Sequence, residues 1–175
     1  MAPPEGIGLA AFNSLPAAAA GVALLACCSS RAWAETLAAG RPYANANQLF
    51  EAADEALAAL SEDDVDEALA GHPRIGERPA PSHSAWSFQE QSGVVAAADR
   101  TRAELAAANR EYEHRFGHVY LVCASGRTAD ELLAILRGRL GNDPVTEQQV
   151  VRTELGKINR NRLERLICPN EEDAR

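Results

Sequence analysis

The sequence predicts an all-α fold, a single compact multi-helix domain, and three observations support this prediction. Hydrophobic residues make up 46% of the chain but aromatic residues only 5%, and alanine is the commonest of the hydrophobic residues. Alanine favours helices, whereas strands prefer β-branched and aromatic side chains. Apolar residues recur at helical spacing in several segments, and only one short run, residues 119–124, resembles a strand. A length of 175 residues fits one domain, spanning residues 1–175.

Four helices are expected in the first half of the chain. Each begins at a proline, serine or asparagine that suits a first turn or an N-cap, and the second and fourth end at a glycine. The third carries apolar residues at amphipathic spacing from Leu49 to Leu60. The expected helices span residues 16–28, 30–40, 45 or 47 to 60, and 61–71.

A proline-rich loop, residues 72–84, follows the fourth helix. Three prolines and a glycine constrain it, and Pro73 restricts His72 to extended geometry. The imidazole of His72 is therefore expected on a stiff backbone.

Three further helices are expected in the second half. Between two of them, residues 119–124 have no second strand to pair with, so they are expected as buried extended or helical backbone. Capping residues mark the starts of the last two helices. The expected helices run from residue 84 or 85 to beyond 109, with a break near 98, from 128 to 140, and from 143 to 167, before a charged tail at 170–175.

The composition excludes several classes of partner. A formal net charge of −8 makes the field of the whole molecule repulsive to phosphate backbones and anionic lipids, so neither nucleic acid nor membrane partners are expected. The four cysteines lack zinc-site spacing, and a glycine interrupts the turn between His114 and His118, so no metal is expected. Such cysteines are typical of a reducing compartment, and we expect a cytoplasmic protein.

The N-terminal region allows an alternative. The apolar run at residues 15–28, followed by Ala32-Trp33-Ala34, is similar to a signal peptide and would make the chain an exported helical protein. However, no lysine or arginine precedes the run, and Pro16 opens it. The run is also too short to span a bilayer. A buried alanine-rich helix is the favoured interpretation.

A carboxylate occupies an unusual position on the helix after the loop. Glu90 lies in a stripe of residues four apart that packs inward, and Ser87 and Gln91 flank it. Burial would raise the pKa of this carboxyl group towards the range useful for proton transfer. The alternative is a glutamate at the rim of the stripe that reaches water.

The last helix has a similar feature. Three apolar residues at four- and three-residue spacing are followed by Arg162, where leucine is expected. A buried guanidinium keeps its charge, so it requires Glu90, another acid or a bound anion. A purely structural ion pair is the alternative. Although His72 alone would more often be structural, the three groups together predict an active site between the helices and the proline-rich loop.

Several short motifs occur in a specific order along almost the whole chain. They are Phe12-Asn13, Cys27-Cys28-x-Ser30-x-x-Trp33, Arg41-Pro42, His72-Pro73-Arg74-Ile75-Gly76, Ser87-x-x-Glu90-Gln91, Asn109-x-x-Tyr112-x-x-x-Phe116-Gly117, Val122-Cys123-Ala124-x-Gly126-Arg127, Arg137, Glu147 and Lys157-Ile158-x-x-x-Arg162-Leu163. Together they resemble the 2-oxo-4-hydroxy-4-carboxy-5-ureidoimidazoline (OHCU) decarboxylase family of purine breakdown.

The resemblance implies an all-helical homodimer that converts OHCU to S-(+)-allantoin without a metal or organic cofactor. It implies catalytic roles for His72 and Glu90. The residues it implies for substrate binding are Pro73, Ser87, Gln91, Val119, Tyr120, Leu121, Val122, Cys123 and Arg162. His118 departs from the family pattern, in which an aromatic residue usually follows Phe-Gly. The alternative function is a non-catalytic helical module that binds ureides, but a pure binding protein has no need of a proton carrier beside a buried acid.

Overall fold

The computed structural model describes residues 6–76 and 99–168. Within these ranges it contains helices and no strand, so the predicted all-α class is confirmed. The described residues form two compact units: the first lies within residues 1–68 and 156–175, and the second within residues 69–155. The assignment of residues 1–175 to a single domain stays a prediction. No helix among the described residues is long and apolar enough to cross a lipid bilayer.

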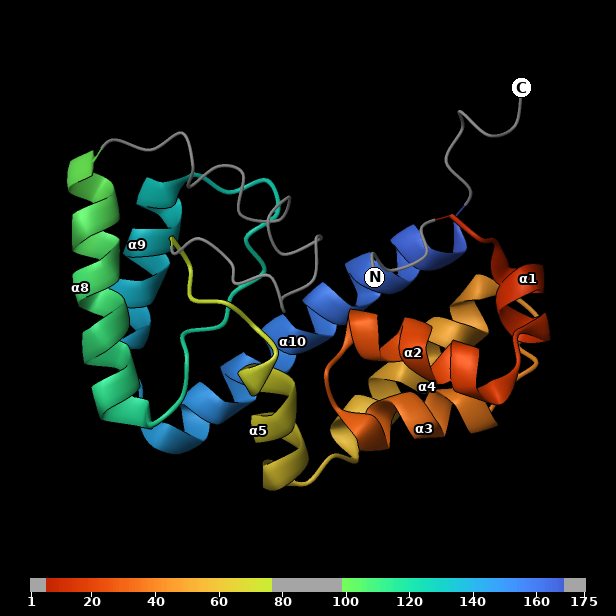
Figure 1. Cartoon of the computed structure of the whole chain (residues 1–175). Coiled ribbons are helices and arrows are strands. Elements are labelled where there is room, and N and C mark those ends of the chain that lie inside the picture. Colours follow the sequence, from red (N-terminus) through yellow and green to blue (C-terminus); the bar gives the residue numbers. More distant parts are fainter. Residues whose placement is uncertain (1–5, 77–98, 169–175) are drawn as a thin grey trace. The chain divides into compact units, whose positions relative to one another are not determined.

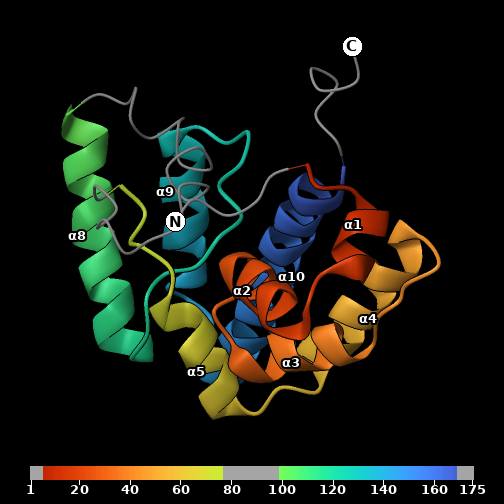
Figure 2. The ribbon, with the colours of Figure 1, turned by 45° about the vertical axis from the view of Figure 1, so that its right-hand side comes forward.

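The first unit is built from the N-terminal helices and the end of the last one. It contains α1 (Leu9–Ser14), α2 (Ala17–Cys27), α3 (Arg31–Ala39), α4 (Ala46–Ala58), most of α5 (Glu62–Ala70) and the C-terminal part of α10 (Pro144–Ile167) (Figure 1). Helix α3 packs against both α2 and α4 (Figure 2). The buried indole of Trp33 joins α3 to α4 by donating to the carbonyl oxygen of Ala53 over 3.0 Å. On α10, the guanidinium of Arg160 lies 4.4 Å from the centre of the Phe50 ring of α4.

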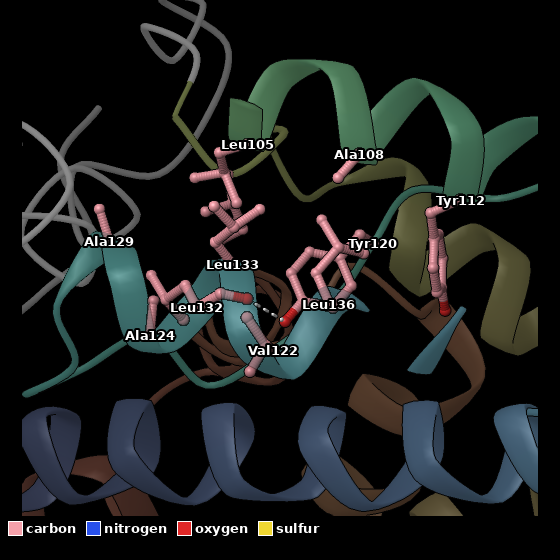
Figure 3. Packing of buried hydrophobic residues seen from close by; sticks show 11 residues of the cluster. Leu105, Ala108, Tyr112, Tyr120, Val122, Ala124, Ala129, Leu132, Leu133 and Leu136 are labelled. Atoms are coloured by element: carbon pink, nitrogen blue, oxygen red, sulfur yellow. Dashed lines mark hydrogen bonds between the residues drawn. The ribbon is translucent and has the colours of Figure 1, made fainter. Parts of the chain in front are cut away.

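The second unit contains α8 (Asp99–Phe116), α9 (Ala129–Arg139) and the N-terminal part of α10. Helices α8 and α9 pack against each other, and residues 117–128 connect them without regular secondary structure. A cluster of buried hydrophobic side chains fills the contact (Figure 3). Its members are Ile75, Leu105, Ala108, Tyr112, Tyr120, Val122, Ala124, Ala129, Leu132, Leu133 and Leu136.

Capping side chains start the helices where the sequence predicts. The Ser30 hydroxyl accepts a hydrogen bond from the Trp33 N–H at the start of α3, which satisfies a backbone donor that the helix leaves unpaired. Side-chain oxygens accept from backbone N–H groups in the same way at the starts of α4, α5, α9 and α10. These residues are Asn45, Ser61, Thr128 and Asp143.

The sequence signals do not predict α1. This helix has six residues and no side-chain cap at its start. Arg41 supports it from a distant part of the chain, since its Nη1 donates to the carbonyl oxygens of Phe12 and Leu15 over 2.8 Å each. Helices this short are marginal on their own, so tertiary contacts decide whether they form.

Two further predictions concern the end of α8 and the backbone of residues 119–124. The helix expected from residue 84 or 85 lies partly outside the described residues, and its described part, α8, ends at Phe116, where Gly117 takes a φ of 80°. Residues 119–124 are not helical, so the helical alternative for them is wrong. Most of their side chains are buried, as the sequence predicts.

Candidate active site

His72 lies two residues after the end of α5 in a buried position, with 7% of its surface exposed. Its backbone N–H donates to the carbonyl oxygen of Leu69 over 2.9 Å and so satisfies an acceptor at the end of the helix. The next residue, Pro73, is half-buried and limits the backbone conformations open to His72. The imidazole is therefore carried on a short connection with little freedom.

Two side chains of α8 fix the chain that follows His72. Asn109 donates from Nδ2 to the carbonyl oxygen of Ile75 over 2.8 Å. Glu113 accepts two hydrogen bonds from the guanidinium of Arg74, over 2.5 and 2.9 Å. A shift of this loop would break contacts with α8 as well as strain the proline.

The 119–123 segment lies in the same unit as His72. Tyr120 and Val122 belong to the hydrophobic cluster (Figure 3). The same cluster contains Ile75. The loop after His72 and the 119–123 segment thus share one core, although 43 or more residues separate Ile75 from the segment along the chain. The structure brings these two predicted parts of the site onto a common support.

Charged side chains from two helices hold the backbone of this segment. Arg139 of α9 donates from Nη1 to the carbonyl oxygen of Leu121 over 2.7 Å. Glu154 of α10 accepts from the N–H of Cys123 through Oε2 over 2.8 Å. The position of the segment therefore depends on buried groups of α9 and α10.

Arg139 is part of a buried polar network. Its Nε and Nη2 donate to Oε1 of Glu147 over 2.8 and 2.5 Å, and Asn142 donates to Oε2 of the same carboxylate over 2.7 Å. The hydroxyl of Tyr112 also donates to Glu147. Burial, together with this hydrogen bond, raises the pKa of Tyr112, so its hydroxyl stays a donor. The network neutralises the Arg139 charge and holds the guanidinium in one orientation.

Tyr120 adds a second attachment of the segment to α9. Its hydroxyl donates to the carbonyl oxygen of Leu132 over 3.2 Å (Figure 3). Burial raises the pKa of this hydroxyl too, which keeps the proton in place. The guanidinium of Arg139 lies 4.9 Å from the centre of the Tyr120 ring, a favourable cation–π distance.

Arg162 lies on α10 in the first unit and is 2% exposed. The predicted inward position of this residue is confirmed, because the apolar residues of its stripe are buried with it. Its Nη1 donates to the carbonyl oxygen of Cys27 over 3.2 Å. An anionic partner for Arg162 stays a prediction.

Polar groups surround Arg162 within the first unit. The thiol of Cys28 is fully buried, and burial raises its pKa, while hydrogen bonds to Ser30 and Asn159 and the charge of Arg162 act in the opposite direction. Asn159 lies three residues before Arg162 on α10 and is 2% exposed. Arg162 is thus one member of a buried polar group inside an otherwise apolar helix face.

Three predicted site residues, Ser87, Glu90 and Gln91, lie outside the described residues. The pairing of His72 with Glu90 therefore stays a prediction. Within residues 6–76 and 99–168, no three His, Cys, Asp or Glu side chains gather as a metal site requires.

Sequence reasoning missed Arg139 and Glu154, and it assigned no role to Glu147. A signal was present for the two glutamates. Glu147 lies four residues before Val151, and Glu154 lies three after it, so both fall on the inward stripe of the last helix. They are charged residues in the same kind of position that drew attention to Arg162. No comparable local signal identifies Arg139, whose contacts depend on the fold.

Residues 13–164 match the family described as OHCU decarboxylase. The chain belongs to the OHCU decarboxylase family. This agrees with the resemblance that the motifs along the sequence predict, and the matched residues include parts of both compact units.

Two curated proteins are similar in sequence to this chain. It is 32% identical over 146 residues to "Uric acid degradation bifunctional protein TTL" of Arabidopsis thaliana, which covers 81% of this chain and 45% of that protein. The chain thus spans less than half the length of this relative. It is 30% identical over 135 residues to the 2-oxo-4-hydroxy-4-carboxy-5-ureidoimidazoline decarboxylase of Amia calva, which covers 74% of this chain and 77% of that protein.

Two solved structures are similar to this member of the OHCU decarboxylase family. A crystal structure of OHCU decarboxylase in the presence of (S)-allantoin aligns with a TM-score of 0.72 at 27% identity, over 81% of this chain and 94% of that chain. A crystal structure of (S)-allantoin synthase aligns with a TM-score of 0.70 at 21% identity, over 92% and 54% of the two chains. The second similarity shows the shared fold alone.

Proposed function

We propose that this chain decarboxylates OHCU to S-(+)-allantoin in urate degradation. The match of residues 13–164 to the OHCU decarboxylase family carries the proposal. The buried position of His72, on a loop fixed to the core that also supports residues 119–123, adds support from this chain itself.

The chemistry of the substrate limits what the protein has to supply. In OHCU the carboxylate is attached to a carbon that bears a hydroxyl group and adjoins a ring C=N bond. When the bond to the carboxylate breaks, CO2 leaves and the released electron pair forms a C=C bond to the neighbouring ring carbon. The π electrons of the C=N bond move to the ring nitrogen, which takes a proton from water, so the substrate is its own electron acceptor. The protein has to orient the carboxylate and deliver a proton to one face of the enol-like intermediate. We therefore propose a reaction without a metal or organic cofactor.

Each predicted site residue has a role in this scheme. His72, coupled to Glu90, takes the proton of the substrate hydroxyl and returns a proton to carbon. Arg162 binds an anionic group of the substrate. The remaining groups hold the ring and the ureido group: Pro73, Ser87, Gln91 and the backbone of residues 119–123.

The test is circular dichroism of a mixture in which uricase and 5-hydroxyisourate hydrolase convert urate to OHCU. A trace of the wild-type protein should produce a rapid dextrorotatory allantoin signal. His72→Ala should leave only the slow racemic decay while keeping the thermal unfolding curve of the wild type. His114→Ala, which removes an exposed histidine of α8, is the matched control and should behave as the wild type.

Two outcomes would contradict parts of the proposal. A rapid signal from a well-folded His72→Ala variant would remove the catalytic role of His72. Slow racemic decay that the wild type does not change would refute the decarboxylase and favour the ureide-binding module.

We further propose that the protein is a homodimer in the cytoplasm. Helix α2 consists only of Ala, Gly, Val, Leu and Cys, yet Val22 and Leu25 are 53% and 37% exposed. An exposed apolar helix face is typical of an interface, and we assign this face to a second copy of the chain. All four cysteines are free thiols, which supports a reducing compartment.

A further inference from the structure

Membership of the hydrophobic cluster alternates along the 119–123 segment and indicates that its backbone is extended. Tyr120 and Val122 belong to the cluster between α8 and α9, whereas Leu121 and Cys123 do not (Figure 3). Alternation with a period of two is characteristic of extended backbone. In such backbone the N–H and C=O groups of alternate residues point to the same edge. Residues 121 and 123 therefore form one edge of the segment, and residues 120 and 122 form the other.

The edge formed by Leu121 and Cys123 is occupied by charged side chains. Arg139 donates to the Leu121 carbonyl oxygen over 2.7 Å, and Glu154 accepts from the Cys123 N–H over 2.8 Å. Arg139 and Glu154 are only 6% and 8% exposed. Hydrogen bonds in which one partner is charged are shorter and stronger than neutral ones, so both anchors are firm.

The opposite edge has unused hydrogen-bonding capacity. Within the part of the chain that the structure describes, the N–H groups of Tyr120 and Val122 have no hydrogen-bond partner. These two residues are only 2% and 3% exposed. Buried backbone N–H groups without an acceptor are rare in proteins and costly, and they mark places where a ligand or an ordered water supplies the acceptor.

We propose that Arg139 and Glu154 are positioning residues for the substrate. They bind the backbone of Leu121 and Cys123 on one edge of the segment. The N–H groups of Tyr120 and Val122, on the other edge, are thereby positioned to donate to oxygen atoms of the substrate ring and ureido group. The inference rests on the proposed function and sharpens it. Of the backbone groups in residues 119–123, it assigns substrate hydrogen bonds only to those on the edge formed by residues 120 and 122.

Arg139 and Glu154 differ in hydrogen-bonding role, which explains why residues of opposite charge hold this segment. Arg139 can only donate and Glu154, when ionised, can only accept. A shift of the segment by one residue would turn its other edge towards them and reverse every side chain. The two anchors together therefore fix both the register and the orientation of the backbone that binds the substrate.

The first test is a titration of the full chain with (S)-allantoin, followed through its backbone amide NMR signals. The Tyr120 and Val122 amides should shift to a saturating value, while the Cys123 amide, which is bonded to Glu154, should stay near its starting position. Saturating shifts at Leu121 and Cys123, with Tyr120 and Val122 unchanged, would overturn the edge assignment.

The second test compares Glu154→Ala, Glu154→Gln and the control Glu164→Ala, which removes an exposed carboxylate of the same helix. Loss of the anchor in Glu154→Ala should lower kcat/KM about tenfold or more. It should also lower the enantiomeric excess of the allantoin formed above the spontaneous rate. Glu154→Gln retains an oxygen that accepts from Cys123 and should recover most of both quantities. The control should match the wild type.

These readouts separate positioning from a merely structural role. A structural role would lower the melting temperature but leave the product of the folded fraction enantiomerically pure. Unchanged kcat/KM and enantiomeric excess in Glu154→Ala, with an active wild type, would refute the positioning role alone. The positioning role would also be refuted if Glu154→Gln had no higher kcat/KM and enantiomeric excess than Glu154→Ala. A wild type that neither converts OHCU nor binds (S)-allantoin would refute the proposed function, and this inference with it.

Discussion

Asn109 donates a hydrogen bond of 2.8 Å to the carbonyl oxygen of Ile75, which lies three residues beyond His72. Asn109 is 3% exposed and lies 34 positions after Ile75 along the chain. The bond joins α8 to the loop that carries the proposed catalytic histidine. Functional side chains need a rigid support of this kind if they are to keep a productive geometry.

Asn109→Ala should therefore reduce both stability and activity. It leaves the buried Ile75 carbonyl without this donor, which costs about 1–3 kcal/mol of unfolding free energy. Urea denaturation and kcat/KM measure the two effects. Asn47→Ala, at an exposed position of α4, is the control and should change the unfolding free energy by less than about 0.5 kcal/mol. Equal stability of the two variants would show that the Asn109 bond does not support the loop.

Removal of one partner of the Arg139–Glu147 ion pair should lower the free energy of unfolding more than removal of both partners does. Glu147→Leu leaves a buried guanidinium uncompensated and should cost about 3–5 kcal/mol of unfolding free energy. Arg139→Met combined with Glu147→Leu should recover much of that loss, because apolar residues often replace a buried pair without penalty. The double variant should still have low kcat/KM, since the Leu121 carbonyl has lost its donor. A double variant less stable than Glu147→Leu in chemical denaturation would contradict this expectation.

The capping box of α9 should make part of the stability depend on pH. Glu131 accepts from the backbone N–H and the hydroxyl of Thr128, and these bonds lower the pKa of the Glu131 carboxyl group below its ordinary value of 4.5. Because the folded pKa lies below the unfolded one, the stabilisation is present above 4.5 and is lost as the pH falls through the folded pKa. The difference in unfolding free energy between the wild type and Glu131→Ala should therefore shrink below pH 4.5. A difference that grows in acid would show the opposite sign of shift.

Val22→Asp should dissociate the proposed homodimer. A carboxylate on the apolar face of α2 would have to be buried in the interface without a partner, which is costly. Light scattering coupled to size-exclusion chromatography measures the mass. Val145→Asp is the matched control, since Val145 is also an exposed valine but lies on α10. A monomeric wild type would refute the homodimer, and dissociation by Val145→Asp alone would move the interface away from α2.

Local signals in the sequence predicted most of the helices correctly. The capping contacts at Ser30 and Thr128 join residues three apart, so the interaction and the signal that reveals it lie in the same short window. The inward stripe of α10 is also local, because helical spacing alone places Arg162 on the face of Leu155 and Ile158. These features follow from backbone geometry that every helix shares.

The candidate site was only partly predictable. Motif order along the chain indicated the family and singled out His72 and Arg162, and the structure shows both to be buried. It did not indicate how residues 119–123 are held. The groups that hold them, Arg139 and Glu154, lie 18 and 31 residues away from their backbone partners.

The sequence by itself determined the all-α class, the helix starts, the inward position of Arg162 and the family. Only the tertiary structure decided that α1 forms and that Asn109 supports the loop after His72. It alone decided which edge of the 119–123 segment is occupied. The reason is physical: caps and stripes arise from contacts within one or two helical turns, whereas these other features depend on polar groups that meet only after distant segments have packed together.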